Sequence, residues 1–388
     1  MNAYVKTAAK KNPCGKRWSI VSAVTMVGLA GAILFVLLGS LLLSSGSGVA
    51  SAAGVDSPMQ IMDKFNMTVT NEIGKALDGI ITIEKTYWLS DDELVAPVPN
   101  PKNYGQADTA AELGWLLEEA ANLIDGQEML FTLDTPVWEM DKVYYCYDET
   151  ILVITWKQII DDMLFNISEV KIAHPSQFRR FLAGGEFGSD KQFLPTEMAA
   201  SVNAVMATSG DFYKFRRSGA VVYDGQLQRF EGTMVDTCFI DDNGDLVLSY
   251  RRDFASEAEA EKFIQENDVR FSLAFGPILV DDGQAIKCDG YSIGEVNEEY
   301  TRAALCQMDS LHYLVVNVTG EPENGRTKRP TISRFAELVG ELGVNKAYAL
   351  DGGQTTVICM DGKAISNPDY GTQRKISDII YFATALRD

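Results

Sequence analysis

The residues best suited to chemistry lie near the C-terminus, where an acidic side chain precedes two glycines and three polar residues. In order they are Asp351, Gly352, Gly353, Gln354, Thr355 and Thr356. The apolar run at 347–350 predicts a strand that ends at Asp351, and paired glycines let a backbone or a ligand approach closely. A carboxylate beside exposed N–H groups and hydroxyls suits a polar ligand. Asp-Gly is also common in hairpin turns, so these residues alone leave a turn and a site equally open.

Histidine and cysteine chemistry is disfavoured. The chain has two histidines, His174 and His312, and they lack the spacing of zinc ligands or of a Ser-His-Asp triad. We therefore expect no metal site and no cofactor, and we interpret His312, in an apolar run, as a satisfied strand or core residue. The five cysteines beyond residue 44 are scattered, so a disulfide framework is not expected and a single bridge stays open.

The first 43 residues predict a basic cytoplasmic tail and a membrane anchor. Residues 1–17 carry five basic side chains and no acid, and residues 18–55 carry no charge. Ile20 to Leu43 is a nearly continuous apolar run of 24 residues, and about 20 such residues span a bilayer. We predict a tail at 1–17, a single transmembrane helix at 18–43 and, by the positive-inside rule, an external remainder. Ala50-Ser51-Ala52 resembles a cleavage site, so removal of the helix stays open.

The charge of the chain limits its partners. The whole chain carries −20 and its first 17 residues +5, so residues 18–388 carry −25. Nucleic acid is not an expected partner, because phosphate backbones are bound by clustered Lys and Arg. The expected contact with the membrane is the N-terminal helix alone.

Beyond the anchor, the pattern changes from helical to β-rich. A linker at 44–54 and helical spacing at 58–83 and 109–124 predict that 44–140 is an extracellular linker and a helical juxtamembrane region. Residues 141–388 are predicted as one domain, with β-rich runs at 143–145, 150–155, 170–172, 221–223, 246–248 and 314–316 and helices at 195–205, 256–266 and 331–342. The mixture predicts an α+β fold, a mixed β-sheet domain with flanking helices.

The region from about Tyr147 to the C-terminus resembles the phosphodiester glycosidase family. The matching segments, in family order, are 169–178, 196–200, 209–213, 219–222 with 224–225, 275–280 with 282–283, 300–304, 342–344 and 350–356. Each segment is short, and their shared order makes the resemblance specific. Residues 86–137 also resemble the flank of membrane-anchored bacterial relatives, which implies a cell-surface protein at the plasma membrane of a Gram-positive bacterium.

The resemblance implies hydrolysis of a sugar-1-phosphodiester and assigns the site. The residues that match positions expected to bind the substrate are Ser209, Gly210, Gly276, Pro277, Gly352, Gly353, Gln354, Thr355 and Thr356. The family usually has Asn at the position of Ser209 and Gly at that of Gln354. A serine shortens or removes the amide hydrogen bond that Asn would donate to the substrate.

The chemistry of this reaction suggests three catalytic residues. Its leaving group, a phosphate monoester, is far more acidic than a sugar alcohol, so the site needs a carboxylate more than it needs a strong general acid. We assign Asp351 to activate water or to offset charge at C1, with Asp211 as second candidate. We assign Arg302 to the phosphate, because guanidinium binds phosphate through two parallel hydrogen bonds. The structural alternatives are a turn residue for Asp211, a surface salt bridge for Arg302, and solvated loops for the basic clusters at 214–217 and 326–329.

The sequence therefore predicts an enzyme: a membrane-anchored extracellular hydrolase that cleaves the C1–O bond of a sugar-1-phosphodiester in a cell-envelope glycopolymer. The alternative is a catalytically silent glycan-binding or exopolysaccharide-assembly module. Ser209 favours the alternative, whereas Asp351, Arg302 and Gly276-Pro277 favour the enzyme.

Overall fold

The computed structural model describes residues 88–90, 95–231, 234–291, 297–320, 328–366 and 371–387. All of them belong to the unit Lys85–Asp388. The predicted tail, anchor and linker and the helical pattern at 58–83 lie outside the described residues. Among the residues that are described, no helix is both long and apolar enough to cross a membrane.

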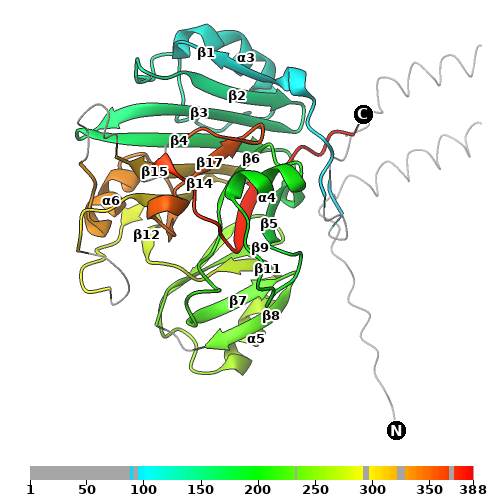
Figure 1. The fold of residues 1–388 in the computed structure, drawn as a ribbon, viewed down its shortest axis with the longest axis vertical. Coiled ribbons are helices and arrows are strands. Elements are labelled where there is room, and N and C mark those ends of the chain that lie inside the picture. Colours follow the sequence, from blue (N-terminus) through cyan, green and yellow to red (C-terminus); the bar gives the residue numbers. More distant parts are fainter. Residues whose placement is uncertain are drawn as a thin grey trace, which may run out of the picture. The chain divides into compact units, whose positions relative to one another are not determined.

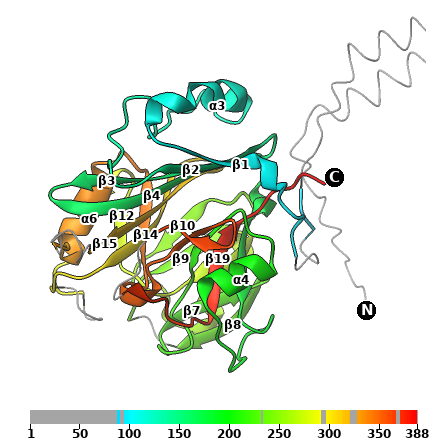
Figure 2. The same ribbon diagram turned by 45° about the horizontal axis from the view of Figure 1, so that its top comes forward.

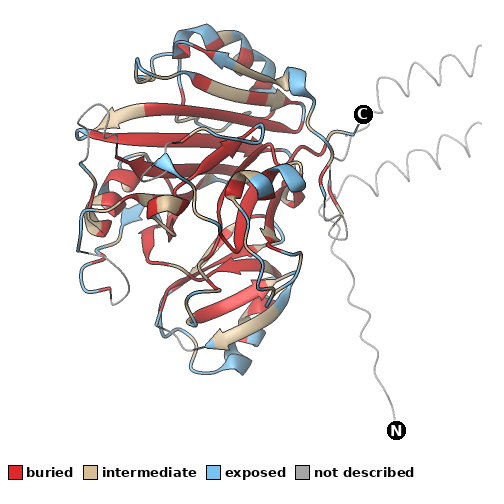
Figure 3. Cartoon of the chain, in the orientation of Figure 1, coloured by how far each residue is buried: buried red, intermediate tan, exposed pale blue. Residues whose placement is uncertain are grey.

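A long antiparallel sheet forms one layer of the described unit (Figure 1). Its nine strands are, in spatial order, β1 (Tyr104–Ala107), β2 (Val143–Asp148), β3 (Ile151–Ile160), β4 (Met163–Ile172), β15 (His312–Thr319), β14 (Arg302–Asp309), β16 (Lys346–Leu350), β12 (Ile278–Asp281) and β13 (Gln284–Ala285). The central strands β4 and β15 are buried at every position, because both faces of the sheet are covered (Figure 3). Strand β1, from the region predicted as linker and helices, pairs with β2.

Three smaller sheets complete the described part of the chain. One has the order β18 (Lys363–Ala364), β17 (Ile358–Met360), β6 (Met206–Ser209), β19 (Asp378–Phe382) and β5 (Phe178–Leu182). The others are β10 (Leu246–Ser249), β9 (Thr237–Asp241) and β11 (Val269–Leu273), and the hairpin of β7 (Gly219–Tyr223) and β8 (Gln226–Glu231). Each strand pair within the described ranges is antiparallel. The prediction of a mixed sheet is therefore wrong there, because side-chain alternation reports a strand but not the direction of its partner.

Two hydrophobic cores lie on opposite faces of the long sheet, and Figure 2 shows the elements that cover each face. On one face pack α6 (Ile332–Gly340) and the helical segment of η2 (Ala110–Leu113), α3 (Gly114–Glu119) and η3 (Ala120–Asn122). The other face packs against β6, β17 and β19 of the five-stranded sheet and against β9 and β11. Helices α4 (Pro195–Ser201) and α5 (Glu257–Glu266) cover the smaller sheets, and single turns form η1 (Pro101–Asn103), η4 (Pro175–Gln177) and η6 (Gly353–Thr355).

The residue patterns predict the correct element type at most positions. The six β-rich runs fall in strands and the three predicted helices of the domain form as α4, α5 and α6. Ser256 caps α5 by accepting a hydrogen bond from the Glu259 N–H, as its side chain predicts. The described residues are rich in β-structure with few helices, so the α+β prediction is confirmed in this coarser form.

Two further predictions concern buried groups. His312 lies fully buried in β15, with Nε2 2.7 Å from Glu169 Oε1. Glu169 also accepts hydrogen bonds from the backbone N–H groups of Leu130 and Phe131 at 2.8 and 2.7 Å, so the pair fastens this loop to the sheet. The cysteines at 146, 238, 288, 306 and 359 are buried and free.

Candidate active site

Asp351 directly follows β16, where close backbone packing requires the two glycines after it. A Cβ on Gly352 would lie 2.3 Å from the Thr301 carbonyl oxygen. Gly353 has φ +67°, and a Cβ there would lie 2.8 Å from the Tyr300 hydroxyl oxygen. The chain can therefore turn at this point only because both residues lack a side chain.

The Asp351 carboxylate is paired with an arginine that sequence reasoning did not select. Its Oδ2 lies 2.5 Å from Arg374 Nη2, and its side chain is 16% exposed. Burial raises the pKa of Asp351 to about 6, although Arg374, the Thr355 hydroxyl and Arg216 each lower it. A carboxyl group with this pKa is mostly ionised at neutral pH, and it can accept a proton when the pH falls slightly below neutral.

A small pocket collects Asp351 with several of the residues predicted for the site. Its lining residues are Ser209, Gly210, Asp211, Phe212, Phe215, Asp351, Arg374, Ile376, Ser377 and Asp378. The structure thus brings together residues from the end of β6, the end of β16 and the start of β19, segments far apart in the sequence. The enclosed volume is about 10 Å³, room for about one water molecule.

Asp211, one of the lining residues, belongs to a buried ionic network at this pocket. Its Oδ2 accepts a hydrogen bond from the Ala274 N–H at 2.9 Å, and its own N–H donates to both oxygens of Asp378. Arg180 Nε lies 2.8 Å from Asp378 Oδ2, with both side chains 0% exposed. Burial raises the pKa of Asp378, and Arg180 lowers it. These contacts favour a structural role for Asp211 over direct attack on a substrate.

Arg302 lies at the start of β14, and it is not among the residues that line the Asp351 pocket. Its Nη2 donates to the Glu298 carbonyl oxygen at 2.8 Å, and its guanidinium lies 5.7 Å from the ring centroid of Tyr300. The structure therefore brings Asp351 and Asp211 to one pocket and places Arg302 outside that lining.

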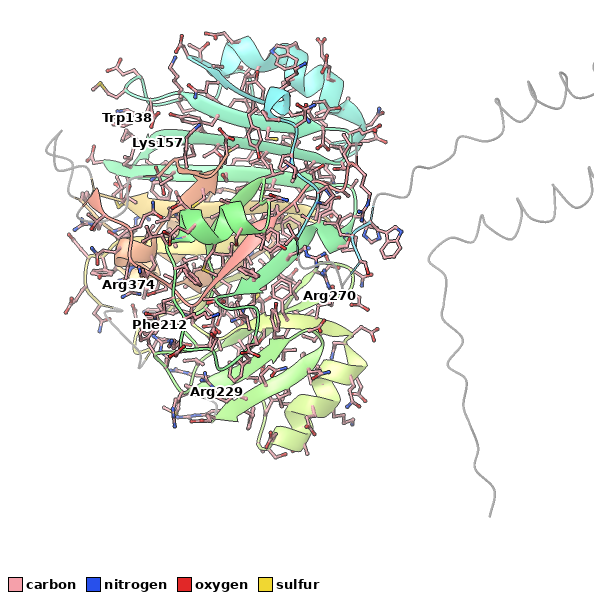
Figure 4. The ribbon with its side chains drawn as sticks, turned by 45° about the vertical axis from the view of Figure 1, so that its right-hand side comes forward. Trp138, Lys157, Phe212, Arg229, Arg270 and Arg374 are labelled. Atoms are coloured by element: carbon pink, nitrogen blue, oxygen red, sulfur yellow. The ribbon has the colours of Figure 1, made fainter. Side chains whose placement is uncertain are left out.

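Two other arginines act on Asp351, and each packs against an aromatic ring. The guanidinium of Arg374 lies 5.5 Å from the ring centroid of Phe212, its labelled neighbour in Figure 4. Arg216 donates to the Phe275 carbonyl oxygen at 2.7 Å, and its guanidinium lies 4.6 Å from the Phe275 ring centroid. Such packing holds guanidinium groups in place beside a carboxylate. The arrangement, one buried acid flanked by two cations, can bind an anion and activate water.

Comparison with known proteins decides the family of this region. A model of the phosphodiester glycosidase family matches residues 202–383. Residues 202–383 form a phosphodiester glycosidase domain. The match includes Ser209, Asp211, Asp351 and Arg374, so the pocket lies within this domain.

The chain is also similar to individual proteins. It is 24% identical over 200 residues to the SPbeta prophage-derived uncharacterized protein YomE of Bacillus subtilis (strain 168), covering 50% of this chain. The chain spans only 30% of the length of that relative. The catalytic domain of zebrafish N-acetylglucosamine-1-phosphodiester alpha-N-acetylglucosaminidase, auto-inhibited by pro-peptide, has a TM-score of 0.47 at 15% identity, covering 72% of this chain and 88% of that one. A hypothetical protein from Synechocystis has a TM-score of 0.44 at 14% identity, covering 62% of this chain and 64% of that one.

The other predicted residues of the phosphodiester glycosidase domain are not among those that line the pocket. Thr355 Oγ1 donates to the Gly352 carbonyl oxygen at 2.8 Å, and the Gln354 amide donates to Thr372 Oγ1 at 3.0 Å. Gly276 has φ +71°, and a Cβ there would lie 2.4 Å from the Tyr291 hydroxyl oxygen. Pro277 follows it and accepts a hydrogen bond from the Ala349 N–H at 2.9 Å through its carbonyl oxygen.

Two buried hydroxyls near Asp351 make no hydrogen bond within the described part of the domain: Ser209 Oγ and Thr356 Oγ1. Ser209 lines the pocket and is 2% exposed, so its hydroxyl can serve a ligand or a bound water. The described residues contain no group of three His, Cys, Asp or Glu side chains placed to hold a metal ion.

Proposed function

We propose that this protein hydrolyses a sugar-1-phosphodiester by cleaving the bond between C1 and the phosphate oxygen. The observation that carries the proposal is the pairing of Asp351, with its raised pKa, to Arg374 inside a phosphodiester glycosidase domain. A buried carboxylate offers a base, and the adjoining guanidinium offers a site for the phosphate.

In the reaction that we propose, water attacks C1 while the C1–O bond breaks. The electron pair of that bond leaves with the phosphate monoester, which needs little protonation because it is a stable anion. The Asp351 carboxylate accepts a proton from the attacking water, and its negative charge offsets the positive charge that develops at C1. The products are the free sugar and a phosphate monoester.

We propose Arg374 and Arg216 as the groups that contact the phosphate. Arg374 pairs directly with Asp351, and the charges of both arginines lower the pKa of its carboxyl group. Arg374 is 41% exposed at its side chain, and a guanidinium can bind two phosphate oxygens at once. The earlier assignment of Arg302 stays a prediction, and it can be tested against Arg374 in one assay.

The substrate must approach from the exposed side of this pocket, because the enclosed space holds about one water molecule. Phe215 is 53% exposed and also lines the pocket. Its ring lies 6.0 Å from the Arg374 guanidinium. We propose that the sugar packs against Phe215 while its phosphate reaches Arg374, since aromatic faces bind apolar sugar faces.

We further propose that the enzyme is a single-pass plasma-membrane protein acting outside a Gram-positive cell on an envelope glycopolymer. The support is the charge-free apolar run at 20–43 behind a basic tail. An external domain of charge −25 would meet sugar phosphodiesters of the envelope as its accessible substrates.

A catalytically silent glycan-binding or exopolysaccharide-assembly module remains the second candidate. Ser209 in place of the family Asn and the small volume at Asp351 favour it. Incubating the purified full chain and its Asp351→Asn variant with a panel of sugar-1-phosphodiesters separates the two. Release of free sugar by the wild type alone supports the enzyme, whereas binding without release supports the silent module.

A further inference from the structure

A second cavity, larger than the pocket at Asp351, lies between the edge strands β5 and β11. Its volume is about 570 Å³, within the range of roughly 300–1,000 Å³ that small-molecule sites occupy. Strand β5 ends the five-stranded sheet and β11 ends the three-stranded one. The β7–β8 turn and the end of α5 supply the remaining walls. None of its lining residues also lines the Asp351 pocket.

Three arginines line this cavity. Arg179 and Arg180 are 9% and 6% exposed, and Arg270 joins them from β11 and is labelled in Figure 4. Backbone carbonyl groups hold two of these side chains in place. Arg179 donates a hydrogen bond to the Ser90 carbonyl oxygen at 3.3 Å, and Arg270 donates one to the Pro175 carbonyl oxygen at 2.9 Å. The side chain of Arg180 is 0% exposed and pairs with Asp378, so Arg179 and Arg270 are the guanidinium groups that can face a ligand. Two such groups at one cavity form a site for an anion, because guanidinium binds carboxylate and phosphate oxygens in pairs.

Two tyrosines, Tyr223 and Tyr381, line the same cavity. Tyr223 is half-buried and can offer its hydroxyl and ring face, whereas Tyr381 is 1% exposed. Burial raises the pKa of both, while Arg179 lowers it, so both hydroxyls are protonated at neutral pH. A protonated phenol can donate to a ligand oxygen, and its ring offers an apolar face.

The rim of the cavity is acidic. Asp224, Asp242 and Asp268 line it, and all three are exposed. Carboxylates accept hydrogen bonds from hydroxyl groups, and they repel an extended polyanion such as nucleic acid. A ligand that fits both the arginines and the acidic rim of the cavity carries one acidic group for the arginines and several hydroxyl groups for the rim.

We propose that this cavity binds a monosaccharide unit bearing one acidic group, a carboxylate or a phosphate. The acidic group contacts Arg179 and Arg270, and the sugar hydroxyls face the three aspartates. The site is separate from the reaction proposed at Asp351. Arg180 links the two sites, because it lines this cavity and pairs with Asp378.

Titration calorimetry of the purified full chain tests the proposal with three probes: glucuronate, glucose 6-phosphate and glucose. We expect an acidic sugar to bind and glucose not to bind, and the two acidic probes show whether carboxylate or phosphate is preferred. Arg270→Gln should weaken binding about tenfold or more. Arg252→Gln, at an exposed arginine outside the cavity lining, is the matched control and should bind as the wild type does.

Asp351→Asn separates this site from the proposed active site and should leave binding unchanged. If Arg270→Gln lowers the melting temperature, Tyr223→Phe replaces it, since it removes one hydroxyl and little volume. The proposal is overturned if neither acidic sugar binds the wild type, or if glucose binds equally well. It is also overturned if Asp351→Asn abolishes binding while Arg270→Gln and Tyr223→Phe retain it.

Discussion

At the scale of single residues, the surroundings of Asp351 set the pKa of its carboxyl group. Burial alone would favour the neutral acid, and two cations beside the group oppose that effect. The balance leaves its pKa at about 6, close to neutral pH, where a general base is most useful. The activity that we propose should therefore fall as pH falls through about 6, because the carboxylate is then protonated.

Asp351→Asn should abolish hydrolysis without unfolding the protein. Because folding raises the pKa of Asp351 from 3.8 to about 6, the ionised group destabilises the folded state once pH exceeds the unfolded value. The amide removes this cost, so the variant should be at least as stable as the wild type at pH 7, by up to roughly 3 kcal/mol. The advantage should vanish below pH 4. Melting temperatures at pH 4 and pH 7 measure this, and a variant that melts lower than wild type at pH 7 contradicts it.

Arg374→Gln tests the phosphate contact against the assignment of Arg302. Loss of a charge-assisted contact should lower kcat/KM by about ten- to a hundredfold, from roughly 1–3 kcal/mol. The same change removes a cation from beside Asp351, so its pKa should rise and the acid limb of the pH–rate profile should move to higher pH. Arg302→Gln is the matched control and should leave that limb in place. A larger loss of kcat/KM in Arg302→Gln than in Arg374→Gln would instead assign the phosphate contact to Arg302.

The sequence could point to Asp351 but not to Arg374. An acid between an apolar run and two glycines is a local pattern, and Asp351 to Gly353 can be read from consecutive residues. Arg374 reaches Asp351 because the chain returns through β17 and β18 before β19, and that path has no signature in residue spacing. Arg216 was noticed as part of a basic cluster, but its packing on Phe275 depends on the tertiary structure.

At the scale of elements, the buried pair of Arg180 and Asp378 joins β5 to β19 and positions the loop after β6. Asp378 holds the Asp211 N–H. Gly210 passes so close that a Cβ there would lie 2.3 Å from Asp378 Oδ2. The loop that carries Ser209 and Asp211 to the pocket is therefore fixed by an ion pair between neighbouring strands.

Asp378→Ala should destabilise the protein strongly, by about 3–5 kcal/mol, because it removes the nearer of the two carboxylates that pair with the buried charge of Arg180, leaving only Asp211 at 3.7 Å. Asp361→Ala is the control, because Asp361 pairs with Lys363 at the surface, with side chains 51% and 73% exposed. That exposed pair is worth about 1 kcal/mol or less. Urea denaturation of both variants measures the difference. Equal losses of unfolding free energy would show that the Arg180 pair has no special structural role.

Element types were predictable and their arrangement was not. The runs at 143–145, 221–223 and 314–316 were predictable as strands, because each is a short run of β-branched, aromatic or other apolar residues bounded by Gly, Asp or Asn. Strand order depends on contacts between distant segments, such as β15 beside β4, which no local pattern encodes. The helical pattern at 109–124 divides into η2, α3 and η3, since short 3-10 turns commonly flank helices.

At the scale of the whole molecule, the proposed membrane topology determines which substrates the enzyme can reach. If residues 18–43 span the membrane with the basic tail inside, then 56–388 lies outside the cell. Protease added to intact cells should digest the C-terminal part and leave a short protected N-terminal fragment, detected by tags at each end. A protected C-terminal tag would exclude an extracellular polymer as the substrate.

Hydrolysis in water labelled with ¹⁸O tests the central claim most directly, because it reports which bond breaks. The full chain is incubated with a sugar-1-phosphodiester that it turns over, and the phosphate monoester product is analysed by mass spectrometry. Cleavage at C1 by water leaves the original oxygen on phosphorus, so the account predicts an unlabelled phosphate monoester and no turnover by Asp351→Asn. Incorporation of ¹⁸O into the phosphate would show attack at phosphorus and would contradict a glycosidase mechanism at Asp351.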